Sequence, residues 1–199
     1  MTTVGSTVGA TGRVIASATP YPWPYHGSFD PRRSALVMIV DSRWRLEGEV
    51  ADAADNRLTK IAQRLHAAGG LVVAVDLCPP RARGGALTLP TASSPKAKHW
   101  ITIDVTISAG GTSAFFSSAL DSTLRRAGCR DLVVAGWGLE GPVHSTLRDA
   151  NDRGYECVLV PDASTSLATG LAGPACSMVE FSGGIFGAVA LTTDLLEIL

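Results

Sequence analysis

The chain has 199 residues, 46% of them hydrophobic and 18% charged, which is enough for one domain with a sizeable core. Its 17 Lys and Arg residues nearly balance its 18 Asp and Glu residues, and no basic run interrupts this balance, so nucleic acid is not expected as a partner. The longest apolar runs, such as ALVMIV, are far shorter than the roughly 20 residues of a membrane span. No signal-peptide pattern opens the chain, and its four cysteines show no CxxC spacing. We therefore expect a cytoplasmic protein with reduced thiols and no membrane partner.

The N-terminal 27 residues differ in composition from the rest of the chain. Residues 1–19 are rich in Gly, Thr, Ser and Ala, which predicts poor order. The motif PYPWPY at 20–25 combines three prolines with aromatic rings. It predicts an extended, stiff arm whose rings pack on its own domain or on a neighbouring subunit. We therefore expect residues 1–27 to form a flexible segment and an arm, and residues 28–199 to form a single domain.

From residue 34 onwards, strand and helix patterns alternate. Continuous apolar runs predict buried parallel strands, and the alternating run ITIDVTI predicts a more peripheral one. The expected strands are 34–41, 71–76, 101–107, 131–136 and 156–161, followed by a short apolar segment at 183–191. The expected helices are 51–68 (with Leu58, Ile61, Ala62 and Leu65 as its apolar stripe), 115–128, 142–153, 174–182 and 193–198. This order predicts an α/β fold: a doubly wound, about six-stranded parallel sheet with helices on both faces.

Polar residues stand at the carboxyl ends of these strands, where α/β sheets bind ligands. Asp41 ends the first strand, Asp76 ends the second, and Glu140 and His144 follow the fourth, so all four are expected to face one crevice. Asp41 is either a cap of the following turn or a general acid or base beside a substrate. The other three are interpreted as solvated loop or helix-start residues rather than catalysts. Neither HxxxH nor HxD spacing occurs among them, so no metal site is expected.

Cys78 is the one cysteine placed at the carboxyl end of a strand, and it has two interpretations. Nearby arginines in PPRARGG favour a reactive thiolate, but no helix start is evident to lower its pKa, which favours an inert loop cysteine. Cys157 lies within a strand and is expected in the core, while Cys129 precedes a strand at the opposite end.

Four stretches carry a resemblance to a known family: PYPWPYHGSFDPRRSALVMIVD, TSAFFSSALDSTLRRAGCRDLVVAG, STLRDANDRGYECVLVPDA and SGGIFGAV. In order and position at strand ends they resemble the isochorismatase-like cysteine hydrolases, most closely biuret hydrolase and related ureido amidohydrolases. The resemblance implies a six-stranded parallel sheet, assembly as dimers or tetramers, and hydrolysis of C–N bonds by an Asp–Lys–Cys triad through a thioester-type intermediate, with no cofactor.

Carried over by position, the resemblance assigns the triad aspartate to Asp41, the lysine to Ala109, give or take one residue, and the cysteine to Pro142. The glutamine that family members often carry two residues after the aspartate is here Arg43. Proline suits the first position of a helix, because that N–H has no intrahelical partner, but it offers no nucleophile. The resemblance therefore implies that two of the three triad residues are replaced.

Three functional hypotheses follow. The first is a pseudoenzyme that acts as a partner or small-molecule-sensing subunit, in a homo-oligomer or together with an active relative. The second is a repurposed enzyme with Asp41 as acid or base on a small ureido, amide or vinyl-ether substrate; the candidate substrate-binding residues are Arg43, Asp76, Cys78, Glu140 and His144. The third places the thiol of Cys78 in the former nucleophile site, which requires attack from a different strand.

Overall fold

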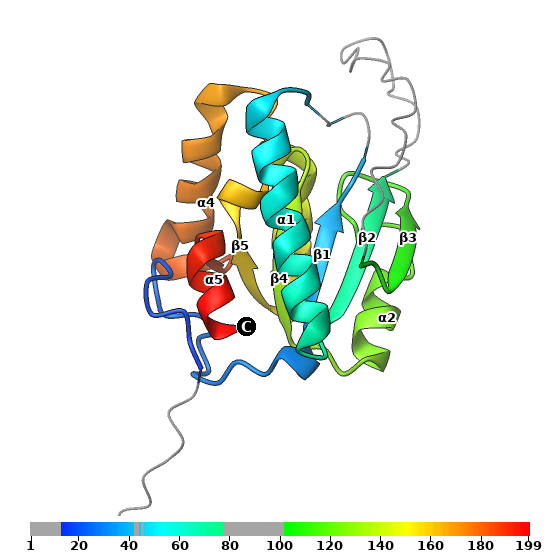
Figure 1. Ribbon diagram of the computed structural model, residues 1–199, viewed down its shortest axis with the longest axis vertical. Helices are drawn as coiled ribbons and strands as arrows, with labels where there is room; N and C mark the ends of the chain where they lie inside the picture. The colour runs from blue at the N-terminus through cyan, green and yellow to red at the C-terminus, as the bar shows by residue number, and fades with distance from the viewer. Residues whose placement is uncertain (1–12, 42–43, 45, 78–101) are drawn as a thin grey trace, which may run out of the picture.

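One parallel sheet of six strands forms the centre of the protein (Figure 1). The computed structural model describes residues 13–41, 44, 46–77 and 102–199. The strands follow the order β3-β2-β1-β4-β5-β6 across the sheet. Their bounds are β1 Ser34–Ile39, β2 Leu71–Leu77, β3 Val105–Ala109, β4 Asp131–Gly136, β5 Glu156–Leu159 and β6 Ala188–Val189. The predicted α/β class and the doubly wound parallel sheet are confirmed.

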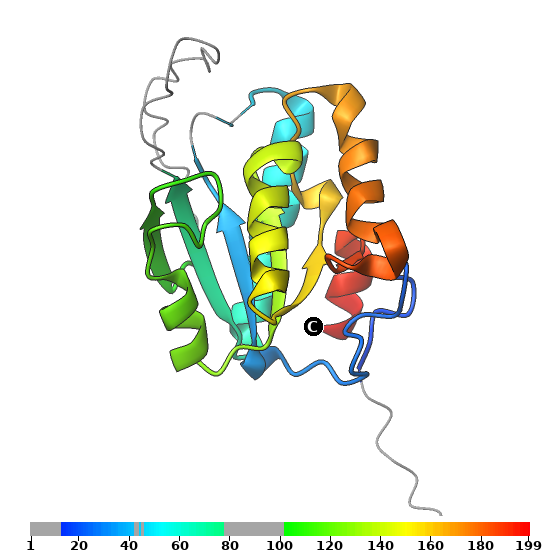
Figure 2. The ribbon, with the colours of Figure 1, turned by 180° about the vertical axis from the view of Figure 1, so that it is seen from behind.

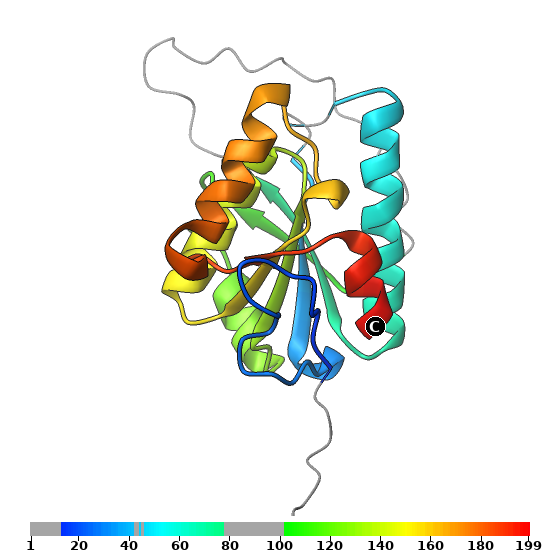
Figure 3. The same cartoon turned by 90° about the vertical axis from the view of Figure 1, so that its left-hand side faces the viewer.

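Helices cover both faces of this sheet (Figures 1 and 2). One face carries α1 Glu49–Ala67 and α5 Thr192–Ile198, and the other carries α2 Leu120–Arg126, α3 His144–Asp152 and α4 Ala172–Gly184. The view along the sheet in Figure 3 shows the strands between these two layers. Because both faces are covered, all six residues of β1 are buried, as a continuous apolar strand requires. In the described part of the chain, no helix is both long and apolar enough to cross a membrane.

Side chains alternate between two hydrophobic clusters, one on each face. Val37 and Val73 belong to the cluster under α2, α3 and α4, whereas Leu36 and Val72 belong to the cluster under α1 and α5. The predicted apolar stripe of α1 is fully buried in the second cluster. Alternate residues of a strand therefore point to opposite faces of the sheet.

Three elements begin later than the sequence predicts; α3 is described below with the site, and β3 and α2 each have a local reason. The edge strand β3 begins at Val105, because Asp104 accepts a hydrogen bond at its Oδ2 from the Val72 N–H (2.8 Å) and ends the preceding loop. Helix α2 begins at Leu120 rather than at residue 115. Ser117 has φ of +49°, a backbone conformation that a right-handed helix cannot continue.

The N-terminal arm packs on its own domain. Ile15 pairs antiparallel with Trp23, and Thr19 pairs with Val189 of β6. Trp23 is fully buried, with its ring 5.3 Å from that of Phe29. Packing on its own domain is one of the two placements predicted for the aromatic rings of the arm, and burial of Trp23 gives its physical reason. Residues 13–19 likewise take part in defined hydrogen bonds, while residues 1–12 lie outside the described part.

Candidate functional site

The sheet has its topological switch point between β1 and β4, so the crevice beyond their carboxyl ends is the first place to look for a site. Asp41 lies two residues after β1 and is 1% exposed. Its main-chain carbonyl accepts a hydrogen bond from the Trp44 N–H (3.0 Å). Asp41 is therefore buried at the carboxyl end of β1, and its carbonyl holds the backbone of Trp44 beside it.

The chain leaves β4 through a glycine and a π-helical turn. Gly138 has φ of +86°, which favours glycine, and the turn spans Leu139–Val143. The N–H groups of Gly141 and Val143 both donate to the Gly138 carbonyl (3.1 Å each), so the hydrogen bonding passes over Pro142, which has no N–H. Pro142 lies inside this turn and is buried. The expectation that it takes the first α-helical position is therefore corrected, because α3 begins at His144.

The Trp44 indole lies against this turn. A Cβ atom added to Gly138 would lie 2.7 Å from Trp44 Cε3 and 2.8 Å from Pro142 Cγ, and one added to Gly141 would lie 2.8 Å from Trp44 Cη2. Both positions require glycine because the two rings approach the backbone so closely. Trp44 thus joins Asp41 to the turn that holds Pro142. Trp44 was not among the candidate residues predicted from the sequence; its position three residues after a strand-end aspartate was the available signal.

Glu140 and His144 are half-buried rather than solvated. Glu140 Oε1 accepts a hydrogen bond from the Ala168 N–H (3.0 Å), which ties the π-helical turn to the segment before α4. Burial, and secondarily the charge of Arg148, lowers the pKa of His144. Glu140 Oε2 and His144 Nε2 are buried and have no hydrogen-bond partner among the described residues. Glu140 therefore links two segments through one oxygen, and both side chains bury one unpaired polar atom near the start of α3.

Of the remaining candidates, the structure describes Asp76 and Ala109. Strand β2 continues through Leu77, whose side chain shares the hydrophobic cluster of Ala109. The side chain of Asp76, one residue earlier, therefore points to the opposite face and is exposed. The expectation that Asp76 faces the same crevice is corrected by this extra strand residue. Ala109 ends β3 and is 1% exposed. Arg43 and Cys78 lie outside the described residues.

The thiols of the described residues are buried or half-buried, and none has an activating environment. Burial, with a smaller contribution from Asp131, raises the pKa of Cys129 to about 11. Burial also raises the pKa of Cys157, which lies in the core as predicted, and that of Cys176 on α4. A thiol with a raised pKa is a poor nucleophile at neutral pH. In the same part of the chain, no group of three or more His, Cys, Asp or Glu side chains is arranged to hold a metal ion.

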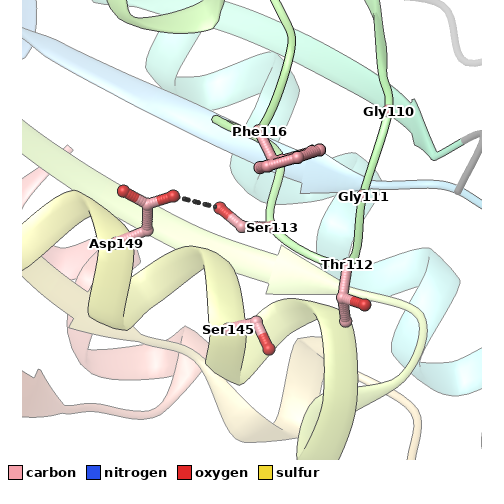
Figure 4. A pocket seen from close by; sticks show the side chains of 7 residues that line it. All are labelled: Gly110, Gly111, Thr112, Ser113, Phe116, Ser145 and Asp149. Atoms are coloured by element: carbon pink, nitrogen blue, oxygen red, sulfur yellow. Dashed lines mark hydrogen bonds between the residues drawn. The ribbon is translucent and has the colours of Figure 1, made fainter.

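A pocket of about 480 Å³ opens between the loop after β3 and helix α3 (Figure 4). Its walls are loop residues 110–113, Phe116, and Ser145 and Asp149 of α3. Ser113 Oγ donates a hydrogen bond to Asp149 Oδ2 (2.7 Å) across it. Neither Asp41 nor the triad-equivalent positions line it. The sequence analysis missed this pocket, although the GGTS segment directly after a strand was a usable signal.

Comparison with known proteins places the chain in a family. The isochorismatase domain model matches residues 37–184. Over 64 residues the chain is 44% identical to a ureidoacrylate amidohydrolase of Variovorax paradoxus. This aligned segment covers 32% of this chain and only 25% of that relative's length. An isochorismatase family protein from Burkholderia thailandensis superposes with a TM-score of 0.66 at 24% identity, covering 84% of this chain and 96% of that one. The nicotinamidase of Bacillus subtilis superposes with a TM-score of 0.61 at 20% identity, covering 79% and 99%. The chain belongs to the isochorismatase family.

Proposed function

We propose that this chain is a non-catalytic member of the isochorismatase family, a partner or ligand-binding subunit that does not hydrolyse amides through a thiol. The observation that carries the proposal is the identity of the residues at two buried positions. Ala109 and Pro142 occupy the places to which the resemblance assigns the lysine and the cysteine, and neither side chain has a heteroatom. Loss of a catalytic nucleophile costs several orders of magnitude in rate.

The surroundings of Pro142 support the proposal. A nucleophile at the start of a helix needs open space above it and backbone N–H groups that can hold an oxyanion. Here the Trp44 indole packs on both glycines of the turn, and proline removes one N–H. The described thiols have raised pKa values and lie elsewhere, so none substitutes for the missing cysteine.

The alternative, in which Asp41 acts as acid or base on a ureido, amide or vinyl-ether substrate, has less support. Its carboxylate is buried, as such chemistry would require. However, Asp41 does not line the pocket described above.

The exposed side of α4 supports the proposed role as a subunit of an oligomer. Met178 is exposed on α4, Phe181 is exposed where the helix breaks at residues 181–183, and Ile185 is exposed just beyond the break, while Ala175 and Val179 face the core. A group of exposed apolar side chains of this kind marks a contact surface. We propose a second copy of this chain or an active relative as the partner, and light scattering after size-exclusion chromatography tests it: a Phe181→Glu variant should shift the mass towards the monomer.

Ammonia release tests the proposed loss of activity. The purified chain is incubated with biuret, ureidoacrylate and nicotinamide beside its Asp41→Asn variant, with an active amidohydrolase as the positive control. We expect no release above the variant. Release that the Asp41→Asn substitution abolishes would contradict the proposal and support acid–base catalysis. Ala109→Lys and Pro142→Cys should restore measurable release only in combination and together with Trp44→Ala, because triad residues act as a unit and the indole packs on the turn that holds Pro142.

A further inference from the structure

The pocket beside α3 has a rigid frame. The Gly110 N–H donates to the Phe116 carbonyl (2.9 Å) and closes the loop, and Ser113 Oγ accepts from the Phe115 N–H (3.2 Å). A Cβ atom on Gly111 would lie 2.7 Å from Phe116 Cδ1, so the ring rests on the glycine backbone. Phe116 nevertheless stays 59% exposed. One side of the ring is therefore held by the loop while much of it remains open to a ligand.

The charge at the pocket is already balanced. Asp149 is the one charged residue in its wall among the described residues. Its Oδ2 accepts from Ser113 and its Oδ1 accepts from Arg153 Nε (2.7 Å). A cation would have to break one of these hydrogen bonds to contact the carboxylate, and an anion would lie beside a carboxylate whose arginine partner is not part of the wall. The electrostatics therefore favour a neutral ligand.

Uncommitted hydrogen-bonding groups face the pocket opposite the aromatic ring. The hydroxyls of Thr112 and Ser145 make no hydrogen bond to any described residue, and Figure 4 shows both on the same side of the pocket, across from Phe116. The N–H groups of loop residues 111–113 likewise donate to no described residue. An exposed ring and free donors on opposite sides suit a flat molecule with a hydrogen-bond acceptor on one edge.

We propose that this pocket binds a small, neutral, planar molecule, an aryl carbonyl or a heteroaromatic ring, which stacks on Phe116 and accepts hydrogen bonds from Ser145 and Thr112. Its volume of about 480 Å³ lies within the range of small-molecule sites. The inference does not rest on the loss of the triad, because the wall shares no residue with Asp41, Ala109 or Pro142.

A matched set of probes tests the ligand class. Acetophenone is planar, neutral and has a carbonyl edge; benzoate adds a negative charge, benzylamine carries a positive charge, and cyclohexyl methyl ketone keeps the carbonyl but lacks the flat ring. Dissociation constants come from ligand-observed NMR titration. We expect acetophenone to bind at least about tenfold more tightly than each of the others. Equal or tighter binding of benzoate or benzylamine, or no binding of acetophenone, would overturn the proposal.

Variants locate the binding. Ser145→Ala should weaken acetophenone binding about fivefold and Phe116→Leu about three- to tenfold, whereas Ser177→Ala on the exposed side of α4 should leave it unchanged. Thermal melting checks that each variant is folded. If acetophenone bound equally to Ser145→Ala and Phe116→Leu, its site would lie elsewhere and the proposal would fail. Acetophenone has no C–N bond, so this result is independent of ammonia release: turnover would overturn the non-catalytic role and leave the pocket's ligand class standing.

Discussion

Two neighbouring regions at the start of α3 differ in how open and polar they are: the π-helical turn that holds Pro142, and the pocket lined by Ser145. In the turn before α3, the rings of Pro142 and Trp44 pack on the backbone of Gly138, and neither ring offers a nucleophile. One turn later, Ser145 presents an uncommitted hydroxyl to an open pocket. The place where the resemblance puts a nucleophile is thus filled by rings, and the open polar surface lies beside it. The sheet and helices of a family can thus be retained while the solvent-accessible polar groups lie in a pocket next to the expected site.

The largest expected effect tests how tightly the first region is packed. In Gly138→Ala, the methyl group would meet Trp44 and Pro142, and φ of +86° adds backbone strain. We expect a loss of about 2–5 kcal/mol in the free energy of unfolding, the sum of left-handed strain and overpacking. Gly154→Ala is the matched control, because φ is +85° and nothing lies within 4 Å of the added atom. It should lose only about 1–2 kcal/mol. Urea denaturation measures both, and equal losses would show that the rings yield easily.

The second expected effect concerns access to the same region. A thiol introduced by Pro142→Cys would lie beside the indole. Iodoacetamide should therefore alkylate the new cysteine only slowly, so that total alkylation of the variant stays close to that of the parent chain. Adding Trp44→Ala should raise the rate at least about tenfold, because removal of the indole gives the reagent access to the thiol. Mass spectrometry of the modified peptide follows the new cysteine separately from the native ones. Rapid alkylation of the Pro142→Cys variant with Trp44 in place would mean that the crevice is open.

Periodicity explains which parts of the molecule could be predicted. The strands, the helices on both faces and the stripe of α1 depend on repeats of two or 3.6 residues, which are visible in the sequence. Asp76 shows the limit of this approach. One more residue in β2 than expected does not change the fold, yet the pleat directs Asp76 to the face opposite that of Leu77 and Ala109.

The sites depended on contacts between distant residues. Trp44 meets Gly138, and Ser113 meets Asp149, through packing that no local pattern encodes. The π-helical turn before α3 likewise depends on the left-handed φ of Gly138. Sequence alone therefore placed Asp41 at a strand end and Pro142 at a helix start, but it could not reveal that an indole packs on the turn that holds Pro142.

A third prediction separates the two serines of the pocket. Ser113 donates to Asp149 and accepts from the Phe115 N–H, so Ser113→Ala should lower the free energy of unfolding by about 1 kcal/mol. Ser145 makes no such bond, and Ser145→Ala should change stability by less than about 0.5 kcal/mol. Chemical denaturation of the two variants gives the comparison. A cost for Ser145→Ala as large as that for Ser113→Ala would show that its hydroxyl serves the fold rather than a ligand.

The smallest expected effect is a pH dependence at the start of α3. Burial and Arg148 hold the pKa of His144 below its ordinary value of 6.5, so the unfolded chain binds a proton more readily than the folded one. The free energy of unfolding should therefore fall as the pH drops below 6.5, and this contribution should level off once the folded-state pKa is passed. Urea denaturation across this range compares the parent with His144→Gln, whose curve should be flatter. Parallel curves would mean that His144 is protonated equally well in both states, which would require the start of α3 to be open to water and would remove much of the contrast between the filled turn and the neighbouring pocket.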